Sequence, residues 1–529
     1  MARVVPPWHA LVWVVLVPWL LALDATTTWT GAVASGASMA LAFGVTVFAW
    51  FPRAMAEYAG APLWIVALAA AVAAPAFQPQ FLAFALARHG ARRRGLGAAG
   101  VATVGAAAYV ATEWLLPKLF GDTLGMALYA SPLLRQAADV AGVGGLTLVV
   151  VLVNECVCAS VRGVRRGTMA VGAPLLVAGL LVASLATYGA VRRGELATAT
   201  TTPPLTVGII QADVAHYDRL AAEVGTFDAV RRILDAHFAL SDELLARQHP
   251  DVLVWPETVY PTTFGHPKSA DGAAFDRAIG GFVVHAGLPL IFGSYDADGG
   301  REYNAAVFLE PGAGDTVTFD VYRKATLFPL TERVPPWLDG PRLRAWLPWV
   351  GSWVPGAGAP VTALHLAGGR VLRVAPLICY DAVDPRNAAR AVRAGAELIV
   401  TLSNDSWLAD GEGAHLHFVV SAFRSIETGR PQVRATTTGI SAVVTPTGDI
   451  LTAAGVHEHA GLVAAVAPVA GPPPPAVRWG DRLGPLALAM AVAMLVLGGR
   501  SDDASVARRD RASSRSPSDS PFPDAAMRR

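Results

Sequence analysis

The chain has 529 residues, of which 53% are hydrophobic and only 16% are charged, and its formal net charge is +1. This length leaves room for more than one domain, and the excess of apolar residues excludes a purely soluble protein and predicts membrane spans. Because the charge is balanced, we expect no nucleic-acid partner. The three cysteines, Cys156, Cys158 and Cys379, imply no disulfide framework.

Six apolar segments fill residues 1–192, which we interpret as an N-terminal transmembrane helical domain. They cover residues 10–23, 31–51, 61–87, 100–116, 140–160 and 169–191. Several reach the roughly 20 residues that a helix needs to cross a bilayer. The first is short, and a cleaved signal peptide is an alternative for it. Pro75 and Pro79 predict a kink within the third segment.

Arginines gather in the loops at residues 88–94 and 162–166 and in the tail that follows residue 500. Positive residues favour the cytoplasmic side of a membrane, so these three places predict an extracytoplasmic position for residues 205–468. Arg192 and Arg193 argue mildly against this topology, because they would lie just outside. The total number of spans and the side of the N-terminus stay open.

The rest of the chain divides by composition. Residues 193–204 form a linker, residues 205–468 alternate strand and helix patterns, and residues 469–482 form a Pro-rich linker. We expect a C-terminal transmembrane helix at 483–499 and a disordered cytoplasmic tail at 500–529. Alternation of this kind predicts an α/β domain. Its expected strands are 205–214, 251–255, 288–295, 371–378 and 397–402, and its expected helices are 227–248 and 415–428.

Three residues of this domain suggest nucleophilic catalysis. Cys379 ends the apolar run VLRVAPLI, Glu257 ends the run DVLVWP, and Lys324 follows VYR. A thiol attacks only as a thiolate, so it needs a base or a cation beside it. A carboxylate takes the proton, and an ammonium stabilises the oxyanion of a tetrahedral intermediate. Each residue taken alone is more often structural or solvated.

Seven motifs in a fixed order resemble those of the apolipoprotein N-acyltransferases, the membrane branch of the nitrilase superfamily. They are WPE at 255–257, YNAA at 303–306, YRK at 322–324, PLTERVP at 329–335, ICYD at 378–381, SNDSW at 403–407 and GRPQVRATTTGISAVVTPTGDI at 429–450. The resemblance implies a polytopic α-helical membrane domain joined to an α-β-β-α sandwich, with a Glu257-Lys324-Cys379 triad at strand ends. The family usually has Glu two residues after the cysteine, whereas this chain has Asp381.

The resemblance also implies the reaction. The enzyme would move a fatty acyl chain from a phospholipid to Cys379, and then to the α-amine of a diacylglyceryl-cysteine on a lipoprotein. It implies no cofactor and no metal, and we expect a monomer in the bacterial inner membrane. Glu332 would orient Lys324 or Glu257, the backbone N–H of Tyr380 would help to bind the oxyanion, and Asp381, Asn404 and Trp407 would shape the pocket.

Two further features accompany this interpretation. The Trp-rich stretch at 338–359 interrupts the domain, and we interpret it as a mobile lid that touches lipid, with ordinary packing as the alternative. Glu113 lies inside an expected span, where a carboxylate needs a partner or water.

Other classes of protein stay open. The same triad serves a membrane-tethered amidase that acts on a small amide, because water can replace the amine. A non-catalytic membrane scaffold with a degenerate nitrilase domain is a second alternative. The one feature that favours it is Asp381, which stands where the family usually has Glu. A transporter would need more paired charge within the spans than the sequence contains.

Overall fold

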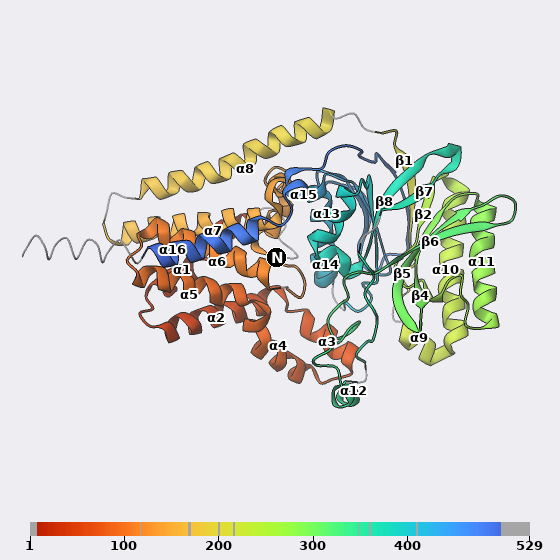
Figure 1. The fold of residues 1–529 in the computed structure, drawn as a ribbon, viewed down its shortest axis with the longest axis horizontal. Coiled ribbons are helices and arrows are strands. Elements are labelled where there is room, and N and C mark those ends of the chain that lie inside the picture. The colour runs from red at the N-terminus through yellow and green to blue at the C-terminus, as the bar shows by residue number, and fades with distance from the viewer. Residues whose placement is uncertain are drawn as a thin grey trace, which may run out of the picture.

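The computed structural model describes residues 8–116, 118–167, 171–198, 202–214, 217–347, 349–358, 361–408 and 411–498. A helical bundle and a two-sheet domain lie end to end, and a long helix, α8, runs along one side of the bundle (Figure 1). The expected tail at 500–529 and part of the linker at 193–204 lie outside the described residues.

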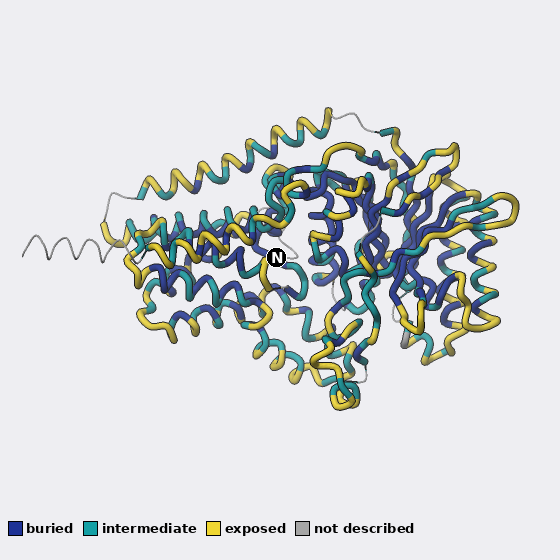
Figure 2. Tube along the Cα trace, viewed as in Figure 1, coloured by how far each residue is buried: buried dark blue, intermediate teal, exposed yellow. Residues whose placement is uncertain are grey.

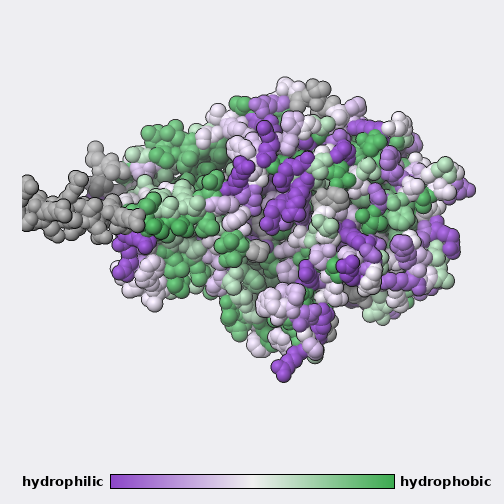
Figure 3. Space-filling model, in the orientation of Figure 1, coloured by the Kyte–Doolittle hydropathy of each residue, from purple (hydrophilic) through white to green (hydrophobic). Residues whose placement is uncertain are grey.

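The bundle contains the expected apolar segments as helices. These helices are η1 (Trp8–Trp13), α1 (Val17–Asp24), α2 (Trp29–Val47), α4 (Leu63–Phe77), α5 (Pro79–Arg93), α6 (Ala98–Leu115), α7 (Ala138–Arg165), α8 (Gly172–Thr198) and α16 (Leu483–Leu497). A further helix, α3 (Phe51–Ala59), follows α2 and was not expected. By length and composition, three helices of the described residues are able to cross a membrane, or up to four if the bent pair α4–α5 is one span. Hydrophobic side chains gather over the bundle and hydrophilic ones over the sheets (Figure 3).

The segment expected at 61–87 as one span with a kink is two helices, α4 and α5, bent by 46°. Gln78 between them has non-helical backbone angles, and Pro79 begins α5. Proline lacks the N–H that would continue the helix, so the predicted kink is confirmed as a break. α4 packs against α2 and α3, and α3 lies next to the two-sheet domain (Figure 1).

Buried ion pairs join the helix ends at the far end of the bundle. Arg88 of α5 donates to Glu155 of α7 at 2.6 Å and also pairs with Asp24 of α1. Arg162 of α7 and Arg92 of α5 contact the same Asp24. The arginine-rich ends of α5 and α7 therefore lie together, away from the sheets.

The second domain consists of two sheets packed face to face. One has the order β13-β1-β2-β4-β5-β6, with β3 paired to β4, and the other has the order β12-β11-β10-β9-β8-β7. The first contains β1 (Leu205–Gln211), β2 (Val252–Val254), β3 (Tyr260–Thr263), β4 (Leu290–Asp298), β5 (Arg301–Pro311), β6 (Val317–Arg323) and β13 (Ala460–Val466). The second contains β7 (Thr362–His365), β8 (Val371–Ile378), β9 (Leu398–Ser403), β10 (Gln432–Thr436), β11 (Ser441–Val444) and β12 (Ile450–Ala454).

Helices cover the outer faces of both sheets, which makes the α-β-β-α sandwich that the family resemblance implied. Helices α10 (Thr226–Arg247) and α11 (Ala270–Ala286) cover the first sheet, and α13 (Pro385–Arg393) and α14 (Gly411–Thr428) cover the second. Aliphatic side chains of both sheets fill the space between them, which is the most deeply buried part of the domain (Figure 2). The remaining short helices are η2 (Leu124–Ala130), η3 (Leu134–Ala137), α9 (Tyr217–Val224), α12 (Pro341–Trp346), η4 (Ala367–Gly369), η5 (Cys379–Val383) and α15 (Pro475–Trp479).

Polar contacts fix the sheet domain onto the bundle. Glu427, near the end of α14, accepts the N–H of Val143, which is free because α7 is kinked at Gly142. Asp449, in the turn before β12, pairs with Arg135 and, at 2.9 Å, with Arg193. Helix α14 therefore lies between the two domains with its far end anchored.

Candidate active site

The predicted site residues follow the ends of four strands. Glu257 comes after β2, Lys324 directly after β6, Cys379 directly after β8 and Asn404 directly after β9. The two sheets face each other, so these ends meet at one edge of the sandwich. The structure brings Glu257, Lys324, Glu332 and Asn404 into one hydrogen-bonded group.

Glu257 and Lys324 form a buried ion pair of 3.1 Å, and Lys324 Nζ also donates to Glu332 Oε1 at 2.7 Å. The second oxygen of Glu257 accepts the backbone N–H of Asn404 at 2.6 Å. Burial alone would lower the pKa of Lys324, but the two carboxylates outweigh it and raise that pKa well above its usual value. Lys324 is therefore a fixed cation.

Glycine permits the close approach that positions Glu257. A Cβ on Gly293 of β4 would lie 2.4 Å from Glu257 Cα, so only glycine fits beside this turn. The neighbouring Thr258 has φ +60°, a left-handed conformation that is uncommon for a threonine. The turn after β2 and the glycine of β4 beside it thus fix the position of the Glu257 carboxylate.

Cys379 also lies in the left-handed region, with φ +45°. Such a conformation costs a non-glycine residue about 1–3 kcal/mol and persists only where the surroundings enforce it. Burial and then the charge of Glu257 raise the pKa of the Cys379 thiol, while Lys324 lowers it. The thiol is therefore protonated near neutral pH, and its reaction needs a base.

Asp381 is fully buried and holds two turns together instead of facing a substrate pocket. One oxygen accepts the N–H groups of Ala325 and Thr326, at 3.1 and 2.7 Å. The other accepts the Tyr322 hydroxyl at 2.9 Å and the Ile378 N–H at 3.0 Å. Burial raises the pKa of Asp381 to about 6, against these hydrogen bonds and Lys324. Its expected part in shaping the substrate pocket stays a prediction.

A narrow, mostly apolar pocket opens beside Cys379. Its lining residues are Phe120, Phe328, Cys379, Tyr380, Val383, Trp407, Leu408, Gly413, Leu416 and His417. Phe120 comes from the bundle, and its ring lies 6.4 Å from that of Trp407 and 5.2 Å from that of Trp50. The wall of the pocket is therefore shared between the two domains. A larger hollow of about 970 Å³ lies between α10 and α11 and contains none of the predicted site residues.

The tryptophans of the stretch at 338–359 and its border divide into two kinds. Trp337 and Trp346 are 83% and 78% exposed. Trp349 packs against Tyr58 of α3, with ring centres 5.5 Å apart, and Trp353 packs against Tyr295. Ordinary packing, which was the alternative to a lid that touches lipid, thus applies to two of these four tryptophans.

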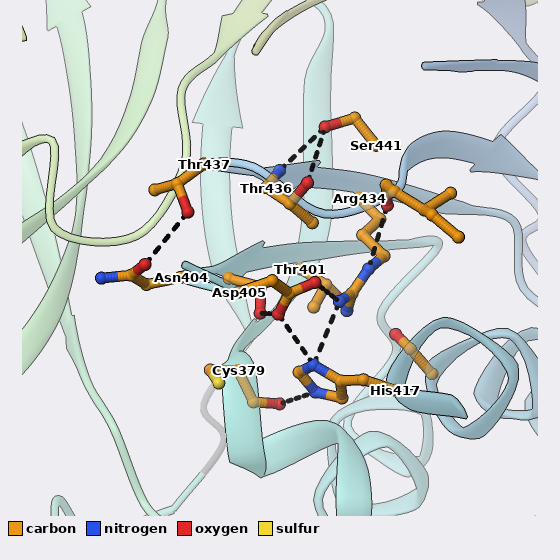
Figure 4. A network of polar contacts seen from close by, with 12 residues as sticks. Cys379, Thr401, Asn404, Asp405, His417, Arg434, Thr436, Thr437 and Ser441 are labelled. Atoms are coloured by element: carbon orange, nitrogen blue, oxygen red, sulfur yellow. Dashed lines mark hydrogen bonds and ion pairs between the residues drawn. The ribbon is translucent and has the colours of Figure 1, made fainter. Parts of the chain in front are cut away.

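Four polar residues of the site were not predicted. Asn304 of β5 donates to Glu257 at 2.7 Å and to Glu332 at 3.2 Å, and it lies within the motif YNAA. Asp405, His417 and Arg434 form a second group behind Cys379 (Figure 4). Their signal in the sequence was the position of Asp405 and Arg434 inside the quoted motifs, whereas His417 lies in none of them.

One group of possible metal ligands occurs among the described residues. The Cys379 sulfur, an Asp405 oxygen and a His417 nitrogen lie within 4.8 Å of one another. However, the Asp405 carboxylate already accepts from Arg434 at 2.9 Å and from Ser403 at 2.7 Å. A cation beside the carboxylate disfavours a second cation, so this arrangement fits a hydrogen-bonded network better than a metal centre.

Two family models match the two halves of this architecture. The carbon–nitrogen hydrolase family matches residues 207–469, and the N-terminal domain of apolipoprotein N-acyltransferase matches residues 3–156. The fold and strand-end site thus define a carbon–nitrogen hydrolase domain joined to a membrane domain.

Curated relatives of this chain agree with these two matches. Apolipoprotein N-acyltransferase 2 of Treponema denticola is 29% identical over 60% of this chain and 61% of its own length. The apolipoprotein N-acyltransferase of Sinorhizobium fredii is 28% identical over 82% of this chain and 80% of its own. The chain is therefore similar to apolipoprotein N-acyltransferases in both of its parts. It spans about three-fifths of the length of several of these relatives. Among solved structures, an amidase from Nesterenkonia sp. matches 51% of this chain and 94% of its own, with 20% identity and a TM-score of 0.37.

Proposed function

We propose that this protein transfers a fatty acyl chain from a phospholipid to the N-terminal amine of diacylglyceryl-cysteine lipoproteins, with Cys379, Glu257 and Lys324 as its catalytic residues. The observation that carries the proposal is the position of Cys379. It lies beside a buried carboxylate–ammonium pair and opens into an apolar pocket whose wall includes Phe120 of the membrane bundle. An acyl chain that arrives from the bilayer fits such a pocket.

In the first step, Glu257 accepts the proton of the Cys379 thiol as the sulfur attacks the ester carbonyl carbon. The carbonyl π electrons move onto oxygen, where Lys324 and the backbone N–H of Tyr380 stabilise the oxyanion. The intermediate then collapses and breaks the ester C–O bond. The departing alkoxide takes the proton from Glu257 and leaves as a lysophospholipid, so an acyl thioester remains.

In the second step, the neutral α-amine of the lipoprotein attacks the thioester carbon, and Glu257 accepts a proton from the amine. The second oxyanion uses the same donors, and its collapse breaks the C–S bond and forms the amide. Glu257 returns the proton to the sulfur. Glu332 and Asn304 hold Lys324 and Glu257 in place through these steps.

The membrane supports this reaction because both substrates carry acyl chains. Extracting a chain into water would cost about 0.8 kcal/mol per CH₂ group. The exposed Trp337 and Trp346 support a lid that touches lipid. We further propose that the sheet domain, residues 205–468, lies on the extracytoplasmic side.

The two alternatives explain less of the geometry. A tethered amidase for a small amide needs no apolar pocket shared with the bundle. A scaffold needs no buried Glu257–Lys324 pair beside a strained cysteine, since both features cost stability.

The first test is mass spectrometry of the purified protein after incubation with phospholipid vesicles. The wild type should gain a fatty-acyl mass that hydroxylamine removes, and a diacylglyceryl lipopeptide should discharge it. Cys379→Ala should gain none, whereas Cys156→Ala, which removes a cysteine of α7, should behave as the wild type. Hydrolysis of small amides without any lipid adduct would favour the amidase, and neither activity in a folded sample would favour the scaffold.

A further inference from the structure

His417 contacts the backbone of Cys379 and lines the same pocket. Its Nε2 lies 3.3 Å from the carbonyl oxygen of Cys379. A carbonyl oxygen only accepts hydrogen bonds, so Nε2 carries the proton and donates. In Figure 4 the sulfur of Cys379 lies on the opposite side of the residue from the imidazole. The ring therefore binds the peptide group and not the thiol.

A buried network fixes the other side of the ring. Nδ1 lies 2.9 Å from Asp405 Oδ1 and 3.2 Å from Arg434 Nη2. Asp405 and Arg434 are themselves fully buried and paired at 2.9 Å. The network leaves the imidazole a single orientation, and α14, which carries it, is anchored at its far end through Glu427.

The bound carbonyl belongs to the same peptide group as the N–H of Tyr380. In a trans peptide the C=O and N–H point in opposite directions. Holding the oxygen toward His417 therefore fixes the direction of the N–H on the other side. A hydrogen bond to the oxygen also polarises the peptide and strengthens the N–H as a donor.

This peptide group needs such support, because Cys379 has the left-handed φ of +45°. Asp381 accepts the N–H of Ile378 just before the cysteine. His417 binds the carbonyl just after it. The two contacts hold the strained turn from both sides, and a turn without them is free to relax.

We propose that His417 is a positioning residue that aims the Tyr380 N–H at the oxyanion, with Asp405 and Arg434 holding the ring. The inference rests on the proposed function only in taking this N–H as an oxyanion donor. It assigns the Asp405–His417–Arg434 group to transition-state stabilisation and not to proton transfer from the thiol.

The test compares two reactions of Cys379 that differ in their need for an oxyanion donor. Acylation by an ester passes through an oxyanion, whereas alkylation by iodoacetamide does not. Acylation is followed by mass spectrometry with phospholipid vesicles and, separately, with p-nitrophenyl butyrate. Loss of one oxyanion donor costs about 10²–10³-fold in rate. His417→Ala should therefore slow acylation by up to about 10²-fold through kcat with KM little changed, and should leave alkylation within about twofold.

Two variants complete the design. His417→Gln keeps an N–H that reaches the carbonyl, so it should restore much of the acylation rate. His415→Ala changes the same residue type on the same helix but outside the pocket lining, so it should match the wild type. Equal loss of acylation and alkylation in His417→Ala, or His417→Gln no better than alanine, would overturn the proposal. If phospholipid fails to acylate even the wild type, the proposed substrate is wrong, and the butyrate comparison still decides the role of His417.

Discussion

At the scale of single residues, the charge beside the thiol makes opposite predictions for two reactions of Cys379. The Glu257 carboxylate raises the pKa of the thiol, so its removal lowers that pKa and increases the thiolate at pH 8. Glu257→Gln should therefore speed alkylation by iodoacetamide several-fold, yet slow thioester formation by about 10²–10⁴-fold because the base is lost. Both rates are measurable by intact mass. Glu302→Gln changes an exposed glutamate and should alter neither rate. Slower alkylation in Glu257→Gln would contradict the assigned charge effect.

Asp381 gives a second prediction at this scale. Its two oxygens accept four hydrogen bonds, whereas an asparagine has one accepting oxygen and an NH₂ that cannot accept. Asp381→Asn should leave buried donors unpaired, at about 1–3 kcal/mol each, and should lower both the melting temperature and the acylation rate. Asp381→Glu restores the residue usual in the family but adds a methylene to a fully buried site, so it should cost about 1–3 kcal/mol. Unchanged melting of Asp381→Asn in detergent would show that these contacts contribute little.

At the scale of elements, the exposed tryptophans around α12 predict a role in reaching lipid. Replacing Trp337 and Trp346 together by alanine should remove about 1.4 kcal/mol of binding to the bilayer. This loss corresponds to a KM for phospholipid in vesicles that is about tenfold higher. Acylation by soluble p-nitrophenyl butyrate serves as the control and should be unchanged, because no bilayer is involved. An equal loss with both esters would mean that the stretch supports the site and does not contact lipid.

Elements with continuous apolar runs were predictable from the sequence, and paired or edge elements were not. β8 has the expected residues, and α10 differs from its expected range by one residue at each end. The hairpin β5–β6 was missed because β6 has three consecutive exposed residues, 318–320, and therefore shows no alternation of buried and exposed side chains. The three triad residues were predicted from strand ends and from the resemblance. The contact of Glu257 with Asn404 and the ring of His417 on Cys379 depend on tertiary packing, which periodicity does not encode.

At the scale of the whole molecule, the arrangement of charge supports one orientation in the membrane. The arginine-rich ends of α5 and α7 lie at the end of the bundle opposite the sheets. Arg192 and Arg193, which argued against this orientation, lie at the sheet end but are paired with Asp139 and Asp449 at 2.6 and 2.9 Å. The positive-inside rule counts Lys and Arg and gives little weight to neighbouring Asp and Glu, so these two arginines still count against the orientation, but they are outnumbered by the arginines at the ends of α5 and α7.

Labelling of engineered cysteines tests this orientation. In a background without the three native cysteines, Ala313→Cys places a thiol in the exposed turn between β5 and β6, and Gly97→Cys places one in the exposed loop after α5. If the sheet domain is extracytoplasmic, a membrane-impermeant maleimide should label Ala313→Cys in intact spheroplasts. Gly97→Cys should react only after the membrane is permeabilised. The reverse pattern would place the active site in the cytoplasm, where lipoprotein precursors that have crossed the membrane could not reach Cys379, and the proposed acceptor would then be wrong.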